Sequence, residues 1–280
     1  MSATPEVAKP SFVRWITRAI KLGISILYFV WNRFWRWLFA NGAGTCVVLY
    51  YHSVPNQFRE RFEEQMRIIA SRKTAIDLRR MDNCFANTHS VAITFDDALQ
   101  SFAENAVPVL MRLKIPATVF VVTEELGSKP GWGEGYYSPD ERVMSSEQLS
   151  SLPDTINVGS HTLTHPHLTA LSQEAAGEEI GLSRTKLEAL LHRPITLFSF
   201  PHGDFNNSTV RQCQDAGYER VFTTEPVLVS AGEGKFVVGR VSADPWDWWA
   251  EFYLKISGAY CWQPYARVVT RNIRALFSSR

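Results

Sequence analysis

The sequence predicts an α/β chain whose parallel sheet closes into a (β/α) barrel, preceded by an amphipathic helix. Apolar segments of strand length alternate with segments of helical periodicity through most of the chain, which is typical of a parallel sheet built from βαβ units. Two of the apolar segments end in Asp or His residues, and barrels of this class carry their chemistry at the carboxyl ends of the strands. The length of 280 residues leaves room for an appendage beside one barrel of about 250 residues.

Residues 1–41 are expected to form an amphipathic helix and a hinge ahead of a catalytic domain at 42–280. The apolar run at 22–31 is about half as long as a membrane-spanning helix requires. On a helical wheel the polar side holds Arg14, Thr17, Arg18, Lys21, Ser25, Asn32 and Arg36, and the apolar side holds Trp15, Ile16, Ile20, Leu27, Phe34, Trp37 and Leu38. Such a helix is expected to lie in the headgroup plane of a membrane. A helix packed on the protein's own core and a spanning anchor are the alternatives.

The catalytic domain is predicted from alternating apolar and amphipathic segments. The strands are expected at 46–51, 91–95, 117–122, 156–159, 195–200, 220–223 and 235–241, and the helices at 58–70, 101–113, from 145 onwards, 172–191 and 208–216. Ser145 and Gln148 have the spacing of a capping box, and Gly217 ends the last helix. The Gly-, Tyr- and Pro-rich segment 127–140 predicts a loop at the mouth of the site.

Charged and imidazole side chains follow two of the predicted strands. Asp96 and Asp97 end the strand at 91–95, and His161 and His165 follow the strand at 156–159. Two acids alone are also common in solvated turns. Together with two imidazoles, however, they suit a divalent cation that keeps open positions for water. One acid can then bind the metal while the other acts as a base.

These residues resemble motifs of a known family. Thr94-Phe-Asp-Asp97 followed by His161-Thr-Leu-Thr-His165 is similar to the first two motifs of the polysaccharide deacetylases, the family 4 carbohydrate esterases with the NodB homology domain. The resemblance spans roughly residues 45–262. It implies the distorted (β/α) barrel of that family, with Asp97, His161 and His165 as the metal ligands and Asp96 as the catalytic base. Zn²⁺ is the expected ion, and Ni²⁺ or Co²⁺ are the alternatives.

The family's third motif, Arg-x-Pro-x-Gly, is matched in part by residues 199–203. Ser199 replaces the arginine that aims at the catalytic Asp in the family, and Arg240 is expected to take over that role; a surface arginine is the alternative reading. Pro201 and Gly203 predict a rigid turn whose backbone N–H faces a developing oxyanion. His202, in the same turn, is expected to be a polar residue of the groove wall.

Two more stretches resemble the remaining motifs. Asp244-Pro-Trp-Asp247-Trp248 is similar to the fourth motif, Asp-x-x-Asp-Trp, which implies that the acids brace the site and that Trp248 lines the acyl pocket. The fifth motif, Leu-x-x-His, occurs early in the chain as Leu49-Tyr-Tyr-His52. This order resembles the circularly permuted subgroup that includes the poly-N-acetylglucosamine deacetylases, and it implies His52 as the general acid.

The predicted function is therefore metal-dependent hydrolysis of the N-acetyl group of an amino sugar, in a polysaccharide or a lipid-linked glycan. His52 is expected to protonate the departing amine, with His202 as the rival donor. An O-acetyl esterase or N-deformylase acting on a glycan or glycolipid is the first alternative. A non-catalytic glycan-binding protein that keeps the fold is the second.

Composition bears on partners and location. The net charge of +1 gives no reason to expect nucleic acid as a partner. The four cysteines are widely spaced and predict core thiols in a reducing compartment. The basic N-terminal helix, with a second surface helix expected near 267–277, predicts a protein peripheral to a bacterial inner membrane and bound to its anionic surface. The cytoplasmic face is favoured, and the periplasmic side is the alternative.

Overall fold

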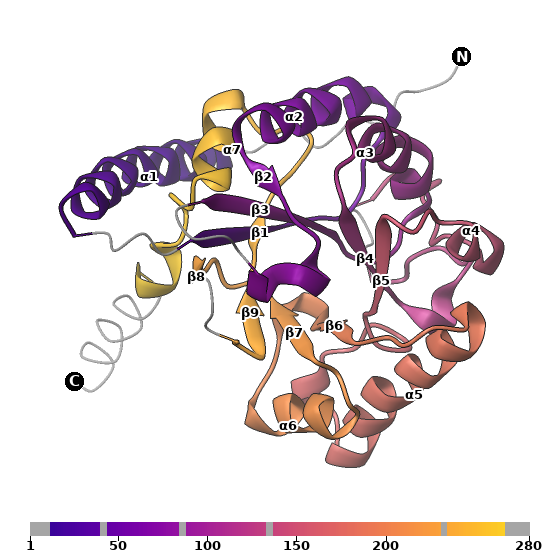
Figure 1. The fold of residues 1–280 in the computed structure, drawn as a ribbon. Helices are drawn as coiled ribbons and strands as arrows, with labels where there is room; N and C mark the ends of the chain where they lie inside the picture. The colour runs from indigo at the N-terminus through magenta and orange to yellow at the C-terminus, as the bar shows by residue number, and fades with distance from the viewer. Residues whose placement is uncertain (1–11, 40–43, 84–87, 133–136, 231–233, 267–280) are drawn as a thin grey trace.

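The computed structural model describes residues 12–39, 44–83, 88–132, 137–230 and 234–266. Its strands form one sheet, in the order β10-β1-β3-β4-β5-β6-β7-β9, wound into a nearly closed barrel (Figure 1). The strands are β1 Thr45–Tyr51, β2 Thr74–Ala75, β3 His89–Phe95, β4 Ala117–Val121, β5 Ile156–Ser160, β6 Leu197–Ser199, β7 Arg220–Thr223, β8 Val229–Ser230, β9 Val237–Gly239 and β10 Val241–Ser242. Every pair along this order is parallel, and the short β8 runs antiparallel to β1. The predicted fold class is confirmed.

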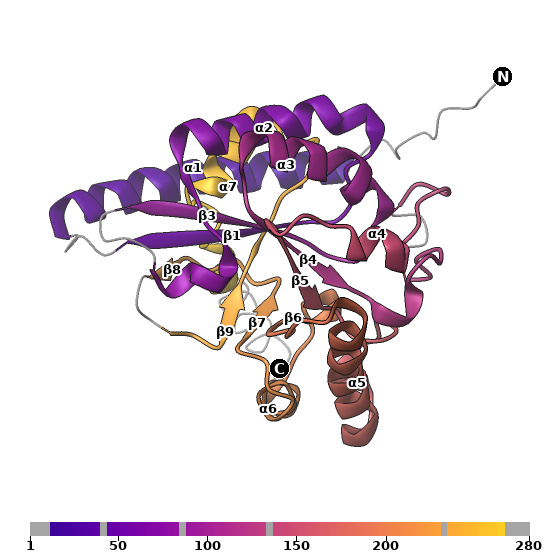
Figure 2. The same cartoon turned by 45° about the vertical axis from the view of Figure 1, so that its right-hand side comes forward.

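Helices cover two sides of the barrel. They are α1 Phe12–Phe39, α2 Arg59–Arg72, α3 Val107–Leu113, α4 Ser146–Ser150, α5 Gln173–Leu191, α6 Asn207–Asp215 and α7 Trp249–Ile256. In Figures 1 and 2, α1, α2, α3 and α7 lie on one side of the strands, and α5 and α6 lie on the other. The capping box predicted from Ser145 and Gln148 is present at the start of α4. The sequence did not predict α7, and the helix expected near 267–277 lies outside the described residues.

The side chains of β1 divide the core between the inside and the outside of the barrel. Val47 and Leu49 pack with the surrounding helices, whereas Cys46 and Val48 belong to a smaller cluster with Phe120. Successive side chains of a strand point to opposite faces, so the smaller cluster fills the barrel interior. Because both faces are buried, the strands read as continuous apolar runs rather than as alternating patterns. Cysteines 46, 213 and 261 are buried, as predicted; Cys84 lies outside the described residues.

One segment closes the barrel. The sequence predicts a single last strand at 235–241, but this segment forms two short strands, β9 and β10, separated by Arg240. β9 pairs with β7 and β10 pairs with β1, so the break occurs where the segment changes partners. At Gly239 a Cβ atom would collide with the carbonyl oxygen of Glu225, and only glycine allows this close approach.

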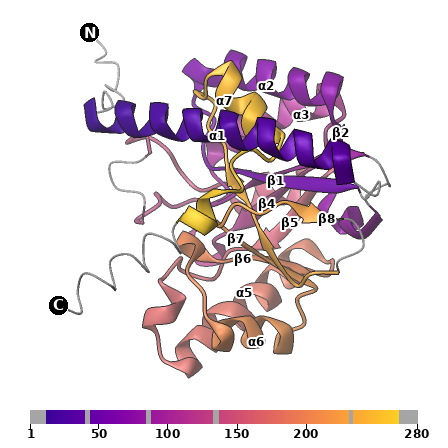
Figure 3. The same ribbon diagram turned by 90° about the vertical axis from the view of Figure 1, so that its left-hand side faces the viewer.

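The N-terminal helix α1 lies along the outside of the molecule beside α7 (Figure 3). Its Ser25 is buried and accepts a hydrogen bond from the indole nitrogen of Trp262 at 2.9 Å. Phe29 contacts Tyr253 of α7 edge-to-face, with ring centroids 6.3 Å apart. Among the helices that the structure describes, none is long and apolar enough to cross a membrane. Residues 41–43 of the hinge expected at 41–44 lie outside the described part of the chain.

Candidate active site

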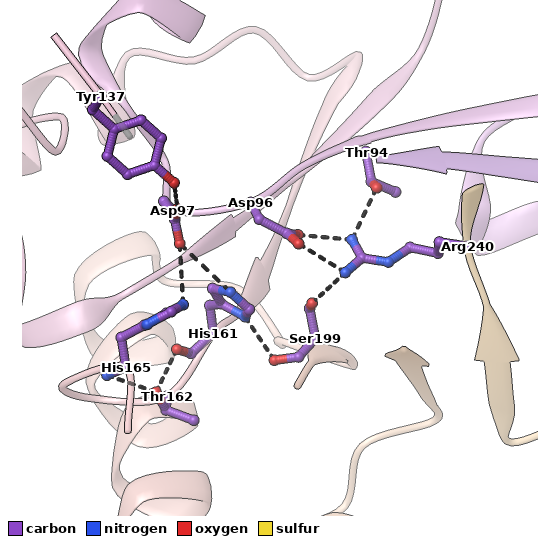
Figure 4. Close-up of polar contacts among 9 residues, drawn as sticks. All are labelled: Thr94, Asp96, Asp97, Tyr137, His161, Thr162, His165, Ser199 and Arg240. Carbon is purple, nitrogen blue, oxygen red and sulfur yellow. Dashed lines mark hydrogen bonds and ion pairs between the residues drawn. The ribbon is translucent and has the colours of Figure 1, made fainter. Parts of the chain in front are cut away.

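Three predicted metal ligands lie together at the carboxyl ends of β3 and β5. Asp97 follows β3, and His161 and His165 belong to the loop after β5. Asp97 Oδ1 is 3.6 Å from His161 Nε2 and 3.4 Å from His165 Nε2 (Figure 4). Candidate ligand atoms of the three residues all lie within 4.8 Å of one another. Because parallel strands end at the same edge of the sheet, residues far apart in sequence meet here.

The two imidazoles are oriented by different contacts. His161 Nδ1 lies 2.7 Å from the carbonyl oxygen of Ser199, so it donates its hydrogen there and leaves the Nε2 lone pair facing Asp97. The His165 ring is held by stacking on Trp132, at 4.6 Å between ring centroids. Burial first, and then the neighbouring His161 and His202, lower the pKa of His165 to about 2. His165 is therefore neutral at physiological pH, as a metal ligand must be.

The loop that carries both imidazoles is fixed by Glu179 of α5. One carboxylate oxygen of Glu179 accepts the backbone N–H groups of Leu163 and Thr164, at 2.8 and 3.0 Å, and the other accepts the Thr164 hydroxyl at 2.7 Å. Within the loop, Thr162 and His165 have φ angles of 71° and 63°. These left-handed conformations cost energy in residues other than glycine, and the Glu179 contacts help to hold them.

Asp96 forms a buried ion pair with Arg240. The two guanidinium nitrogens Nη1 and Nη2 donate to the two carboxylate oxygens of Asp96 at 2.7 and 2.8 Å. The same guanidinium donates to Ser199 Oγ at 2.7 Å and to Thr94 Oγ1 at 3.0 Å, as Figure 4 shows. Arg240 thus reaches Asp96, the candidate base, from the barrel-closing segment, beside Ser199, which stands where the family motif has arginine.

This ion pair keeps Asp96 in its ionised form. Burial by itself raises the pKa of Asp96, but the positive charge and hydrogen bonds of Arg240, together with the nearby His161 and His52, outweigh burial and hold that pKa far below its ordinary value. Asp97 lies in a different environment, with Oδ2 accepting a hydrogen bond from the Tyr137 hydroxyl. Of the two adjacent acids, Asp96 is therefore bound to an arginine, and Asp97 faces two imidazoles.

The turn at Pro201–Gly203 is held in a constrained backbone conformation. His202 and Gly203 have φ angles of 58° and 70°, and a Cβ atom at Gly203 would collide with Thr224. The Gly203 N–H donates to the carbonyl oxygen of Phe200 at 3.0 Å, and Pro201 has no N–H. These two residues therefore offer no free N–H, and the expected contact between the turn's backbone and an oxyanion stays a prediction. The exposed His202 ring stacks on His167, with centroids 3.9 Å apart.

His52 follows β1, next to the strand that ends in Asp96. Its ring lies 5.7 Å from Tyr50 and 6.3 Å from Tyr137, between ring centroids. Tyr137 therefore contacts the candidate acid and a candidate metal ligand at once. Sequence patterns did not identify Tyr137 or Trp132, because both come from the loop 127–140, which has no periodicity. The predicted position of this loop at the mouth of the site was the only sequence signal that its residues could reach the site.

The residues that resemble the fourth motif point toward α1. Asp247 accepts the backbone N–H of Asp244 at 2.9 Å and the ammonium group of Lys255 at 2.7 Å. Its other oxygen lies 3.5 Å from the guanidinium of Arg18, which stacks over Trp248 at 4.7 Å from the ring centroid. Asp247 thus holds the backbone of Asp244, and Trp248 lies against Arg18 of the N-terminal helix.

A cavity of about 540 Å³ lies between α1 and the carboxyl end of the barrel. Tyr50, Ser242, Asp244 and Trp246 line it from the barrel side, together with Thr17, Arg18 and Lys21 from α1. Tyr50 also contacts the Asp96–Arg240 pair, since the guanidinium carbon lies 4.8 Å from its ring centroid. The cavity is therefore next to the candidate catalytic base, and α1 forms part of its wall.

Comparisons with known sequences agree with this arrangement. The family model described as polysaccharide deacetylase matches residues 86–221, a range that includes Asp96, Asp97, His161 and His165. The Bacillus subtilis (strain 168) protein YxkH, whose name assigns it to the polysaccharide deacetylases, is 26% identical over 226 residues, covering 75% of each chain. The poly-beta-1,6-N-acetyl-D-glucosamine N-deacetylase of Staphylococcus aureus (strain N315) is 25% identical over 162 residues, 54% of this chain and 53% of that enzyme. This second match spans about half of the enzyme's length.

Solved structures share the barrel. IcaB from Ammonifex degensii superposes with a TM-score of 0.66 and 22% identity, over 77% of this chain and 97% of that one. The Streptococcus pyogenes deacetylase PplD, in complex with acetate, gives a TM-score of 0.62 and 20% identity, over 76% of this chain and 98% of that one. The motifs, the family model and the named relatives agree, so residues 86–221 are identified as a polysaccharide deacetylase domain, and the solved structures share its fold.

Proposed function

We propose that the protein removes the acetyl group from an N-acetylated amino sugar of a glycan by metal-dependent hydrolysis of the amide. One observation carries the proposal: a three-donor site, Asp97, His161 and His165, stands beside the ionised, arginine-bound carboxylate of Asp96. A metal-assisted hydrolase needs both a place for the ion and a separate base.

The three donors fit a divalent metal. Asp97 Oδ1 is buried without a hydrogen-bond partner among the described residues, and the Nε2 atoms of His161 and His165 face it. Two neutral imidazoles and one carboxylate suit Zn²⁺, and they also accept Ni²⁺ or Co²⁺. When bound, such an ion lowers the pKa of a water molecule and polarises the amide carbonyl.

Two side chains would move the protons. Asp96, held in its ionised form by Arg240, accepts a proton from the attacking water. His52 then donates a proton to the nitrogen of the departing amino sugar. His202 is a weaker candidate for this role, because partial burial and the adjacent His167 and His161 lower the pKa of His202 below its usual value and favour the neutral ring.

The substrate class is inferred from the cavity and from the relatives. Tyr50 and Trp246 present aromatic rings on which a sugar can stack, and Asp244 and Ser242 add polar groups beside them. The Staphylococcus aureus relative is named for N-deacetylation of poly-beta-1,6-N-acetyl-D-glucosamine. We infer an N-acetylglucosamine-type unit as the substrate, and a lipid-linked glycan as the form in which α1 would meet it.

The test combines metal analysis with acetate release from N-acetylglucosamine oligomers. We expect a His161→Ala, His165→Ala double variant to lose bound metal and activity together. Asp96→Asn should keep the metal while turnover falls about 100-fold to 10,000-fold. Full metal occupancy in the double variant would show that the ligands are elsewhere. Hydrolysis of only O-acetyl or N-formyl analogues, supplied in the same panel, would replace N-deacetylation with the corresponding reaction.

A further inference from the structure

The N-terminal helix presents an uncovered apolar stripe to solvent. Its members recur every three or four residues and are 39–72% exposed: Ile20, Ile24, Leu27, Trp31, Phe34 and Leu38. At about 1.5 Å of rise per residue, the helix is about 42 Å long. Trp35 near its end, also exposed, lies beside the stripe and widens the same surface. Soluble chains seldom leave a continuous apolar face of this size without a partner.

The helix cannot turn this stripe inward, because its opposite side is already bound to the barrel. Arg18 donates two hydrogen bonds to Glu251 Oε2, at 2.8 and 2.5 Å. About two turns after Arg18, Ser25 is buried against Trp262. Leu22 and Phe29 pack against the core on the same side of the helix. The polar residues that the sequence places in a headgroup region are therefore partly used to hold the helix on the protein.

The charges that remain on the helix are all positive. Between Phe12 and Phe39 there are basic residues and no Asp or Glu. Lys21 and Arg33 are exposed; helical geometry puts Lys21 at one border of the stripe and Arg33 farther round the helix on the other side. An apolar surface bordered by cations and tryptophans matches the boundary between acyl chains and anionic headgroups.

A second copy of the chain fits this surface less well. The stripe has the spacing of a coiled-coil seam, but charged residues of both signs usually flank such a seam and set the pairing. Here the flanks are apolar or cationic, so two facing copies of α1 would bring like charges together without acids to pair them. Tryptophan at the centre of the stripe also fills the holes of a helical partner poorly.

We propose that the stripe of α1 is a membrane-docking surface, which lies flat in the headgroup region of a bilayer containing anionic lipid and holds the barrel on that bilayer. The helix is the contact element and does not cross. The proposal stands independently of the proposed hydrolysis, because it rests on the outer side of α1 and its test requires no turnover.

The test is flotation of the full-length protein with vesicles of phosphatidylcholine, with or without phosphatidylglycerol. Flotation separates bound protein from any aggregate, which stays at the bottom. We expect the parent protein to float with the vesicles that contain phosphatidylglycerol, and less so as salt increases. An Ile20→Gln, Leu27→Gln, Trp31→Gln variant should bind at least tenfold more weakly.

The matched control replaces three exposed apolar residues elsewhere: Met111→Gln, Leu171→Gln and Leu182→Gln. It should float like the parent, and metal content and circular dichroism should show all three proteins folded. Equal flotation of the parent and the stripe variant would overturn the proposal. So would a parent that binds neither vesicle and elutes as a dimer that the stripe variant dissociates, because the occupant would then be a second copy.

Discussion

Arg240 sets the pH range in which Asp96 can accept a proton. The Asp96 carboxylate is buried, and burial raises its pKa; the Arg240 guanidinium, together with the nearby His161 and His52, lowers that pKa further than burial raises it. Removing the guanidinium takes away the largest contribution that opposes burial, so the pKa of Asp96 is expected to rise and a smaller fraction of Asp96 is ionised at acidic pH. We therefore expect Arg240→Met to move the acidic limb of the kcat/KM profile to higher pH.

Arg240→Lys is the control for this prediction, since it keeps the charge and loses the two-point geometry, and its acidic limb should lie between those of the parent and Arg240→Met. An unpaired buried carboxylate is expected to lower the free energy of unfolding by about 3–5 kcal/mol. The profiles should be measured at a temperature where circular dichroism shows both variants folded. An acidic limb that stays in place in Arg240→Met would mean that another group limits the reaction.

The contribution of His52 to the cleavage rate is expected to increase with the basicity of the leaving group. An amine must be protonated to depart, and general acid catalysis contributes about 100-fold to 10,000-fold. We expect His52→Ala to reduce amide cleavage strongly. Cleavage of an activated ester of the same sugar should be spared, because the leaving group of that ester departs without being protonated. His202→Ala, with metal content measured alongside, is the comparison. If His202→Ala loses amide cleavage and His52→Ala stays within a few-fold of the parent, the donor is His202.

At the scale of elements, Glu179 connects α5 to the metal-binding loop. Its carboxylate holds Leu163 and Thr164, between the two imidazoles, and such supporting contacts are commonly worth 10-fold to 100-fold in metal affinity. We expect Glu179→Ala to weaken metal binding by about that factor, measured by competition with a chelator. Glu178→Ala removes the adjacent, exposed acid and should bind metal like the parent. Equal affinities in both variants would show that the loop keeps its shape without α5.

The sequence predicted the strands well because each one is an apolar run with turn residues at its ends, and it placed Asp97, His161 and His165 together because parallel strands share an edge. It missed α7, because the aromatic-rich residues of this helix come directly after the segment that resembles the fourth motif and were not separated from it. Tyr137, Trp132 and Glu179 could not be predicted to reach the site, since their contacts depend on how a loop and a helix pack in three dimensions. The strand break at Arg240 depends in the same way on a change of pairing partner.

At the scale of the whole molecule, Arg18 joins the N-terminal helix to the barrel. It contacts Asp247 and Glu251 and covers Trp248, and the acids that it neutralises are buried. Hydrogen bonds between charged groups are worth about 1.5–3 kcal/mol, and Arg18 is partly exposed, so the lower value applies. We expect Arg18→Met to loosen α1, measured as faster amide hydrogen exchange within residues 12–39. Arg33→Met removes an exposed cation from the same helix and should leave the exchange rates unchanged; similar rates in both variants would contradict a clamp at Arg18.

Asp96 can be oriented by Arg240 only after the segment at 237–242 has been synthesised and has joined the sheet. The guanidinium that orients Asp96 comes from the segment at 237–242, the last part of the sheet to be synthesised and the part that joins β7 to β1. A nascent polypeptide that has emerged only as far as β7 already carries both histidines and both aspartates, but its base has no orienting cation. We expect such a fragment to be inert while it leaves the ribosome. In the folded protein, thermal opening of this seam would remove the orienting cation from Asp96. The candidate metal ligands follow β3 and β5 and would still lie together.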